Sequence, residues 1–131
     1  MLRSSPNEPS PWVKNIKEFH EKFGHPVNSQ GYRPNIDEIS LRNTLLLDEV
    51  EECIFATIDG KRADILDALA DTITVCIGTA LLYGFDIDEA MARVHESNMS
   101  KLGADGKPIY RADGKILKGD EFVPPYLDDL V

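Results

Sequence analysis

Two stretches of sequence decide the fold: residues 44–58, TLLLDEVEECIFATI, and residues 62–83, RADILDALADTITVCIGTALLY. In both, apolar residues recur at spacings of three and four, which is the period of an amphipathic helix. Asp59-Gly60 stands between them and breaks the pattern. The sequence therefore predicts two consecutive antiparallel helices, the first ending at about Ile58 and the second running from about Arg62 to Tyr83.

The ends and the core faces of these two helices are predicted as well. Asn35 followed three residues later by Glu38 is typical of a capping box, and it starts the first helix of the pair. Gly84 ends the second helix. The residues expected to line the core are Ile39, Leu46, Val50 and Cys53 in the first helix and Ile65, Leu69, Ile73 and Ile77 in the second.

One more helix is predicted on each side of this pair. Residues 11–23 precede the helix breakers Gly24 and Pro26, and their apolar face is expected to pack in the core. Asp86 or Asp88 caps a last helix that reaches about Leu102. Four helices with short connections predict an all-α, four-helix bundle-like fold. The core residues of the outer helices are expected to be Trp12, Ile16, Phe19 and Phe23, and Ile87, Met91, Val94 and Met99.

The last part of the chain has a different pattern. Ala-Asp-Gly-Lys occurs at 104–107 and again at 112–115, with Ile109 and Tyr110 between the two copies. Such a repeat of turn residues indicates a hairpin-like or looped excursion. We therefore expect a single domain over 1–131, with a helical core over about 11–102 and an irregular C-terminal extension over 103–131.

Composition narrows the classes of function. The formal net charge is −9, which argues against nucleic acid as a partner, because binding to a phosphate backbone needs a basic face. The longest apolar run, Thr72–Phe85, is too short to cross a bilayer and is interrupted by Gly78. Met1–Pro11 lacks the apolar core of a signal peptide. We expect a cytoplasmic protein without membrane contact, in which Cys53 and Cys76 are buried free thiols.

Carboxylates mark the two central helices. Asp48, Glu49 and Glu52 share about a third of the circumference of the first helix, and Asp64, Asp67 and Asp71 share one narrow face of the second. Two such stripes meet when the helices lie antiparallel, and the usual way to neutralise them is a metal ion. Oxygen ligands favour Mg²⁺ or Mn²⁺. The spacing leaves a solvated acidic surface open as the alternative.

At these residues the sequence resembles the MazG-like all-α nucleotide pyrophosphohydrolases, a superfamily that includes dimeric dUTPases and phosphoribosyl-ATP pyrophosphohydrolase. Glu49-Val50-Glu51-Glu52 is similar to the first half of the family's acidic motif, and Asp67-Ala68-Leu69-Ala70-Asp71 to the second half. His95-Glu96-Ser97-Asn98-Met99-Ser100-Lys101 and Asp113-Gly114-Lys115-Ile116-Leu117-Lys118-Gly119 resemble one branch of the superfamily. The resemblance covers about residues 12–125.

The resemblance implies a Mg²⁺-dependent enzyme that cleaves a nucleoside triphosphate into the monophosphate and pyrophosphate by two-metal hydrolysis. It implies metal ligation by Glu49, Glu52, Asp67 and Asp71, with Mn²⁺ able to substitute, and a role for Asp48 or Glu49 in positioning or deprotonating the attacking water. There is one departure. Ala68 stands where the family has Glu, so we expect Asp67 to replace it, with Asp64 as an outer or substitute ligand.

The resemblance also suggests residues that contact substrate. These are Arg42, Asn98, Lys101, Lys115 and Lys118, which would bind phosphates, sugar or base. For Arg42 a solvent-facing position is the alternative, and for the lysines a solvated surface. Independently of the resemblance, apolar residues on more than one face of the four helices predict a homodimer or a dimer of dimers. Two rival functions stay open: hydrolysis of phosphoribosyl-ATP in histidine synthesis, and a non-catalytic helical module that senses nucleotide or dimerises.

Overall fold

The computed structural model describes residues 8–131, and the chain divides into two compact units, one ending at Phe85 and one running from Asp86 to Val131. The first unit holds α1 (Pro11–Phe23), α2 (Ile36–Asp59) and α3 (Arg62–Tyr83). The second holds α4 (Ile87–Met99), β1 (Ile109–Tyr110), β2 (Ile116–Leu117) and the 3₁₀ helix η1 (Asp128–Leu130). The predicted all-α class is confirmed, and the expectation of one domain over 1–131 stays a prediction.

The helix boundaries follow the predicted caps closely. Asn35 Oδ1 accepts a hydrogen bond from the backbone N–H of Glu38 at 2.9 Å, and Glu38 Oε1 accepts one from the N–H of Asn35 at 3.0 Å. This reciprocal pair is the capping box. Gly60 ends α2 with a φ of 75°, a left-handed conformation that glycine adopts without strain. The fourth helix is shorter than predicted, because it ends at Met99 rather than at about Leu102.

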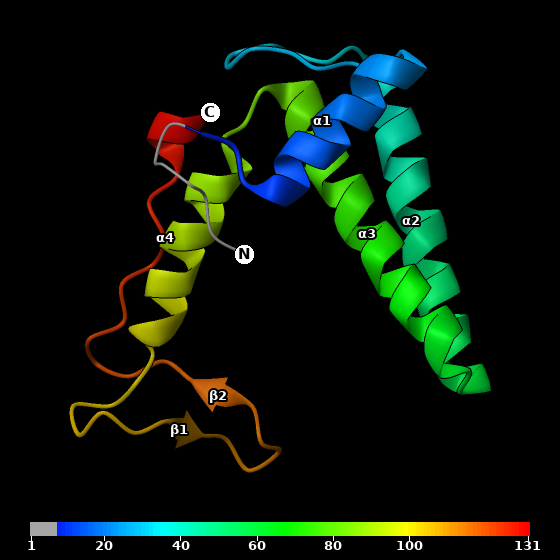
Figure 1. Cartoon of the computed structure of the whole chain (residues 1–131). Helices are drawn as coiled ribbons and strands as arrows, with labels where there is room; N and C mark the ends of the chain where they lie inside the picture. The colour runs from blue at the N-terminus through cyan, green and yellow to red at the C-terminus, as the bar shows by residue number, and fades with distance from the viewer. Residues whose placement is uncertain (1–7) are drawn as a thin grey trace. The chain divides into compact units, whose positions relative to one another are not determined.

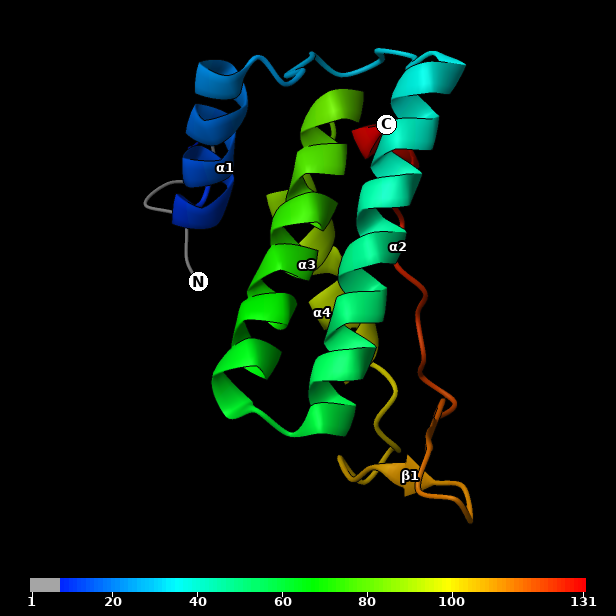
Figure 2. The same ribbon diagram turned by 90° about the vertical axis from the view of Figure 1, so that its right-hand side faces the viewer.

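Helices α2 and α3 form an antiparallel hairpin that turns at Gly60 and Lys61, and they lie side by side in both views (Figures 1 and 2). Along α2, the residues with restricted exposure recur at spacings of three and four, as in a coiled-coil seam. The residues of this stripe are Ile39, Arg42, Leu46, Glu49, Cys53 and Ala56, and Glu38 and Leu45 next to it are half-buried as well. The face of α2 that packs on α3 therefore carries a cation and a carboxylate among apolar side chains.

The predicted core stripe of α3 is partly wrong. Leu69 and Ile73 are 47% and 43% exposed, whereas Ala68, Gly78 and Ala80 are buried. Because α3 is apolar on almost every side, the spacing of its large residues does not reveal the contact face. The large residues Ile77, Leu81 and Leu82 are buried as well, so the predicted core position of Ile77 agrees with the structure. Cys76 is exposed and Cys53 is half-buried, so the expectation of two buried thiols is also wrong.

Helix α1 packs on α3 with a face different from the predicted one (Figure 2). Val13, Ile16 and His20 are buried, whereas Trp12 is 52% and Phe19 is 43% exposed. The core expectation for Trp12 and Phe19 is therefore wrong, because the sequence stripe followed the aromatic residues and the buried stripe is displaced from it. Trp12 instead borders a groove of about 270 Å³ between α1 and α3.

His20 is a buried polar residue at the point where α1 meets α3. Its Nδ1 lies 2.9 Å from the carbonyl oxygen of Pro26. Since a carbonyl only accepts, Nδ1 carries the proton and Nε2 is the unprotonated nitrogen of the neutral ring. Burial lowers the pKa of His20 below its ordinary value of 6.5, and the nearby Arg42 charge lowers it further.

By length and composition, α3 is the one helix in the described part of the chain that could cross a membrane, and a third of the relevant window (33%) is buried. The helix is longer than the apolar run Thr72–Phe85 on which the sequence argument rested, because it begins at Arg62. Core helices of soluble proteins pass the same test. The absence of membrane contact therefore stays a prediction.

In the second unit, the two Ala-Asp-Gly-Lys copies adopt the same turn. The N–H of Gly103 donates to the carbonyl of Lys107 at 2.8 Å, and the N–H of Arg111 donates to the carbonyl of Lys115 at 2.7 Å. In each copy the aspartate, Asp105 or Asp113, accepts a hydrogen bond from the N–H two residues later. The second turn joins β1 to β2, which confirms the predicted hairpin.

The C-terminal segment of this unit is held on α4 by Arg93. The Arg93 guanidinium donates to both carboxylate oxygens of Asp129, to the carbonyl of Tyr126 and to Glu89. A cavity of about 590 Å³ lies between α4 and this segment. The contact joins residues more than thirty positions apart, and no sequence pattern predicts it.

The folded state should lose stability in mild acid through His20. Because its folded-state pKa lies below 6.5, the unfolded chain binds more protons in the window below that value, so the free energy of unfolding falls as the pH falls through it. Chemical denaturation at pH 7.5 and pH 5.5 measures the difference. It should be smaller in His20→Gln than in wild type. Equal pH dependence in wild type and His20→Gln would contradict this assignment.

Candidate metal centre

Three carboxylates meet on the α2–α3 hairpin. Glu49 and Glu52 come from α2 and Asp71 from α3, and one oxygen of each lies within 4.8 Å of the others. Both helix segments lie roughly ten residues, or ~15 Å, from the turn at Lys61, so the antiparallel register brings them level. Glu49 and Asp71 are half-buried and Glu52 is exposed. The hairpin thus gathers negative charge at one point that solvent can reach.

Glu49 is the least compensated member of this triad. Its Oε2 is buried and is the one such side-chain atom without a hydrogen-bond partner among the described residues. Burial raises the pKa of Glu49, and the charges of Glu52 and Asp71 raise it further. An orphaned carboxylate oxygen beside two more carboxylates is the donor set that a divalent cation would satisfy. The residues present therefore fit a metal ion.

The donor atoms indicate which metal. All three ligands are carboxylate oxygens, which suit Mg²⁺ or Mn²⁺ rather than zinc. Mg²⁺ usually keeps several waters and takes the rest of its shell from phosphates. Three carboxylates leave room for both.

Of the other predicted acidic residues, Asp48 and Asp67 are exposed and lie outside the triad. The Asp48 charge contributes to the raised pKa of Glu49, so it belongs to the electrostatic surroundings of the site. Asp64 is exposed as well. Ala68, at the family's Glu position, is only 5% exposed. Ligation by Asp67 or Asp64, and a role for Asp48 or Glu49 toward water, remain predictions.

Arg42 occupies a position that neither sequence alternative described. It is 7% exposed, its Nε donates to Thr79 Oγ1 at 3.0 Å, and its Nη2 donates to the carbonyl of Val75 at 2.7 Å. The solvent-facing expectation is wrong. The guanidinium lies between α2 and α3, where it joins the two helices by hydrogen bonds. Contact of Arg42 with a substrate phosphate stays a prediction.

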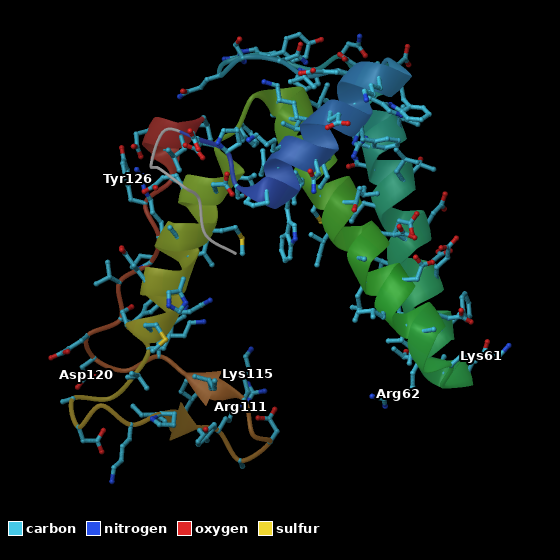
Figure 3. The ribbon with its side chains drawn as sticks, in the orientation of Figure 1. Lys61, Arg62, Arg111, Lys115, Asp120 and Tyr126 are labelled. Carbon is cyan, nitrogen blue, oxygen red and sulfur yellow. The ribbon has the colours of Figure 1, made fainter. Side chains whose placement is uncertain are left out.

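The remaining predicted substrate residues lie in the second unit. Asn98 is exposed on the last turn of α4, and Lys101 follows that helix and is half-buried. Lys115 is exposed beside Arg111 at the hairpin turn (Figure 3). Lys118 Nζ lies 4.7 Å from the ring centroid of Phe122, a cation–π contact. Their contact with substrate stays a prediction.

Sequence reasoning missed the junction that His20, Arg42 and Gly78 form. A β-carbon added at Gly78 would lie 2.5 Å from Arg42 Nη2 and 2.7 Å from His20 Nε2. The available signal was a glycine inside a long helical pattern, which costs helix stability and so usually has a packing reason. The apolar run Thr72–Phe85 that Gly78 interrupts does not by itself show that a guanidinium lies there.

An acidic triad on an antiparallel pair of helices, in an all-α chain, is the arrangement expected of an all-α nucleotide pyrophosphohydrolase. The chain belongs to the phosphoribosyl-ATP pyrophosphohydrolase family, whose model matches residues 16–98. That range contains α2, α3 and all three carboxylates of the triad. The family resemblance seen in the sequence is therefore confirmed.

Individual relatives are more distant. The chain is 27% identical over 117 residues to the uncharacterized protein L479 of Acanthamoeba polyphaga mimivirus, a match that covers 86% of this chain and 44% of that protein. The chain thus spans less than half the length of this relative. A crystal structure of a protein proposed to be an NTP pyrophosphohydrolase, from Exiguobacterium sp. 255-15, is 22% identical, with 90% of each chain covered and a TM-score of 0.43.

Replacing one ligand should remove the response of the protein to metal. A ligand that binds only the folded state at 100 times its Kd stabilises it by about 2.7 kcal/mol, and Mn²⁺ should raise the Tm of the wild type accordingly. Glu49→Gln and Asp71→Asn should lose most of this rise. Without metal, both variants should be at least as stable as wild type, because like-charge repulsion is reduced.

The matched control is Glu51→Gln, which removes an exposed carboxylate from the same helix outside the triad. It should keep the full response to Mn²⁺. The same titration tests whether Asp67 is a ligand. If Asp67 replaces the missing Glu, Asp67→Ala should weaken Mn²⁺ binding nearly as much as Asp71→Ala. A wild-type response in Glu49→Gln would place the metal elsewhere.

Proposed function

We propose that this chain is a Mg²⁺-dependent nucleoside triphosphate pyrophosphohydrolase, which converts a (deoxy)nucleoside triphosphate and water into the monophosphate and pyrophosphate. The observation that carries the proposal is the convergence of Glu49, Glu52 and Asp71, with an unpartnered Glu49 oxygen, inside the matched family range. The exclusion of nucleic acid as a partner, a cytoplasmic location and a role in nucleotide-pool control belong to the same proposal.

The residues of the site would divide the work. Glu49, Glu52 and Asp71, with Asp67 as a fourth ligand, would hold the metal, which when bound offsets phosphate charge and lowers the pKa of bound water. Asp48 or Glu49 would accept the proton of the water that breaks the α–β phosphoanhydride bond. Arg42, Asn98, Lys101, Lys115 and Lys118 remain the proposed contacts to substrate.

A second substrate has specific support. The matching family is described by hydrolysis of phosphoribosyl-ATP, which breaks the same type of bond. The extension after Leu102 and the additional carboxylate of Asp48 favour a free nucleotide. A non-catalytic nucleotide-sensing or dimerising module is the remaining outcome.

The expected activity is release of pyrophosphate that requires Mg²⁺ or Mn²⁺ and stops in excess EDTA. A panel of the common ribo- and deoxyribonucleoside triphosphates together with phosphoribosyl-ATP would identify the substrate. Glu52→Ala should reduce turnover at least a hundredfold, since it removes a direct ligand. Release of orthophosphate with a diphosphate product, or full turnover in EDTA, would contradict the proposed reaction, and binding without turnover across the panel would favour the sensing module.

We also propose that the chain forms a homodimer or a dimer of dimers. Leu47, Val50, Ile54 and Ile58 form a stripe on α2 at spacings of three and four, and each is at least 37% exposed. This stripe lies on the side of α2 away from Glu49 and Arg42 by helical geometry, so α3 does not cover it. Sedimentation equilibrium at micromolar concentration should give a multiple of the 14.6 kDa chain mass. Ile54→Asp should shift the protein toward monomer, and a monomeric wild type would contradict the proposal.

A further inference from the structure

The Arg42 guanidinium is a buried cation that no carboxylate neutralises in the hydrogen bonds described for it. Removing such a charge from water costs several kcal/mol unless its hydrogen bonds are satisfied. Here Nε and Nη2 donate to two acceptors on the same helix, Thr79 Oγ1 and the carbonyl of Val75, which lie one turn apart on α3. A planar guanidinium donates to both only in one position along α3.

The surface of α3 is shaped to receive this group. Gly78 leaves the space in which Nη2 lies, since a β-carbon there would be 2.5 Å from that atom. His20 of α1 is buried on the same side, and its Nε2 would lie 2.7 Å from a β-carbon added at Gly78. Because His20 Nδ1 holds the ring proton for Pro26, the nitrogen near the guanidinium is unprotonated. All three helices of the unit therefore meet around the Arg42 side chain.

This contact determines how far α2 and α3 can slide along one another. In the described part of the chain, the hydrogen bonds that join α2 to α3 are those of Arg42. Apolar packing alone tolerates small shifts, whereas a hydrogen bond has a narrow range of distance and angle. Arg42 precedes Glu49 by two helical turns, and Val75 follows Asp71 by one turn. The register set at Arg42 is thus transmitted along two rigid helices to the triad.

The triad cannot set this register by itself. Glu49, Glu52 and Asp71 each bring a carboxylate oxygen within 4.8 Å of the others, and like charges this close repel one another without a cation, so their contact favours displacement of the helices. A metal site, however, needs ligands held within about 0.5 Å of their productive positions. An attractive contact elsewhere on the same two helices must supply that alignment.

We infer that Arg42 is a positioning residue of the metal centre: its guanidinium, seated on Gly78 and bonded to Val75 and Thr79, fixes the register of α2 on α3 that presents Glu49 and Glu52 to Asp71. The inference rests on the proposed function, because it assigns Arg42 a role toward the proposed metal. It gives the residue a part in metal binding that needs no contact with the metal, and this part does not depend on the proposed contact of Arg42 with substrate.

The test is the Kd for Mn²⁺, measured by isothermal titration calorimetry on the full-length chain at a temperature where every variant is folded. Loss of a residue that supports metal ligands costs about 10–100-fold in metal affinity, and we expect Arg42→Met to weaken Mn²⁺ binding at least tenfold. Arg42→Lys should fall in between, since one ammonium cannot reach both acceptors. Gly78→Ala should weaken binding several-fold while every charged residue is retained, and Thr79→Val should do so to a smaller extent.

Two other roles for Arg42 give different results. If it acted only through its charge, Arg42→Met would bind Mn²⁺ more tightly, because a cation near the site opposes a second cation. If it contributed only to stability, Kd would be unchanged while the Tm fell. Ile16→Ala is the matched control, because Ile16 is buried on α1 and its truncation should cost about 2–4 kcal/mol of stability without changing Kd.

Each result supports or overturns the inference. Weaker binding in Arg42→Met and Gly78→Ala, with unchanged binding in Ile16→Ala, supports it. If Arg42→Met does not fold, Gly78→Ala and Thr79→Val decide the question. Unchanged or tighter binding in the variants, with wild-type binding intact, overturns this inference alone. Absence of Mn²⁺ binding to the wild type overturns the proposed metal centre and this inference together.

Discussion

The contact between α2 and α3 places opposite charges at two levels of one helical seam. The Arg42 guanidinium occupies the upper level, where Val75, Thr79 and the space above Gly78 receive it. The carboxylates of Glu49, Glu52 and Asp71 occupy the lower level. Burying these charges costs free energy at both levels: the hydrogen bonds of Arg42 offset the cost at the upper level, and the carboxylates of the lower level have no counter-charge without a metal. Helix α1 takes part by closing the upper level with a neutral histidine.

Stability and function make opposite demands on this seam. The triad weakens the metal-free protein because burial and neighbouring charges oppose ionisation of Glu49. The same features make the site suited to a divalent cation, whose binding energy then contributes to the folded state. Such strain is expected where a site is kept ready for a ligand, and the long, capped helices on either side provide the rigidity to hold it.

The second unit is organised on a different principle. Two copies of one four-residue sequence form the same hydrogen-bonded turn, and a single arginine, Arg93, ties the C-terminal segment to α4. Here local turn chemistry and the ion pairs of Arg93 with Glu89 and Asp129 hold the segments together. The unit carries several exposed basic side chains, among them Lys115 and Arg111, in a chain whose net charge is −9. Of these two, Lys115 is among the proposed contacts to substrate, whereas Arg111 is paired with Asp113.

The sequence by itself determined the class of fold, the ends of the first three helices, the hairpin and the location of the acidic residues. These depend on local physics: capping by Asn35, helix-ending Gly60 and Gly84, turn-forming Asp-Gly pairs, and the spacing of carboxylates along a helix. Family resemblance added the expected chemistry.

Only the tertiary structure decided which face of each helix is buried. On α1 the aromatic stripe lies outward and His20 inward, and on α3 the small residues Ala68 and Gly78 face the core while Leu69 does not. Spacing identifies a stripe but not the partner it meets, and on a helix that is apolar all round it does not identify even the stripe. The same limit explains Arg42, because whether an arginine lies in solvent or inside a seam depends on acceptors thirty-three and thirty-seven residues away.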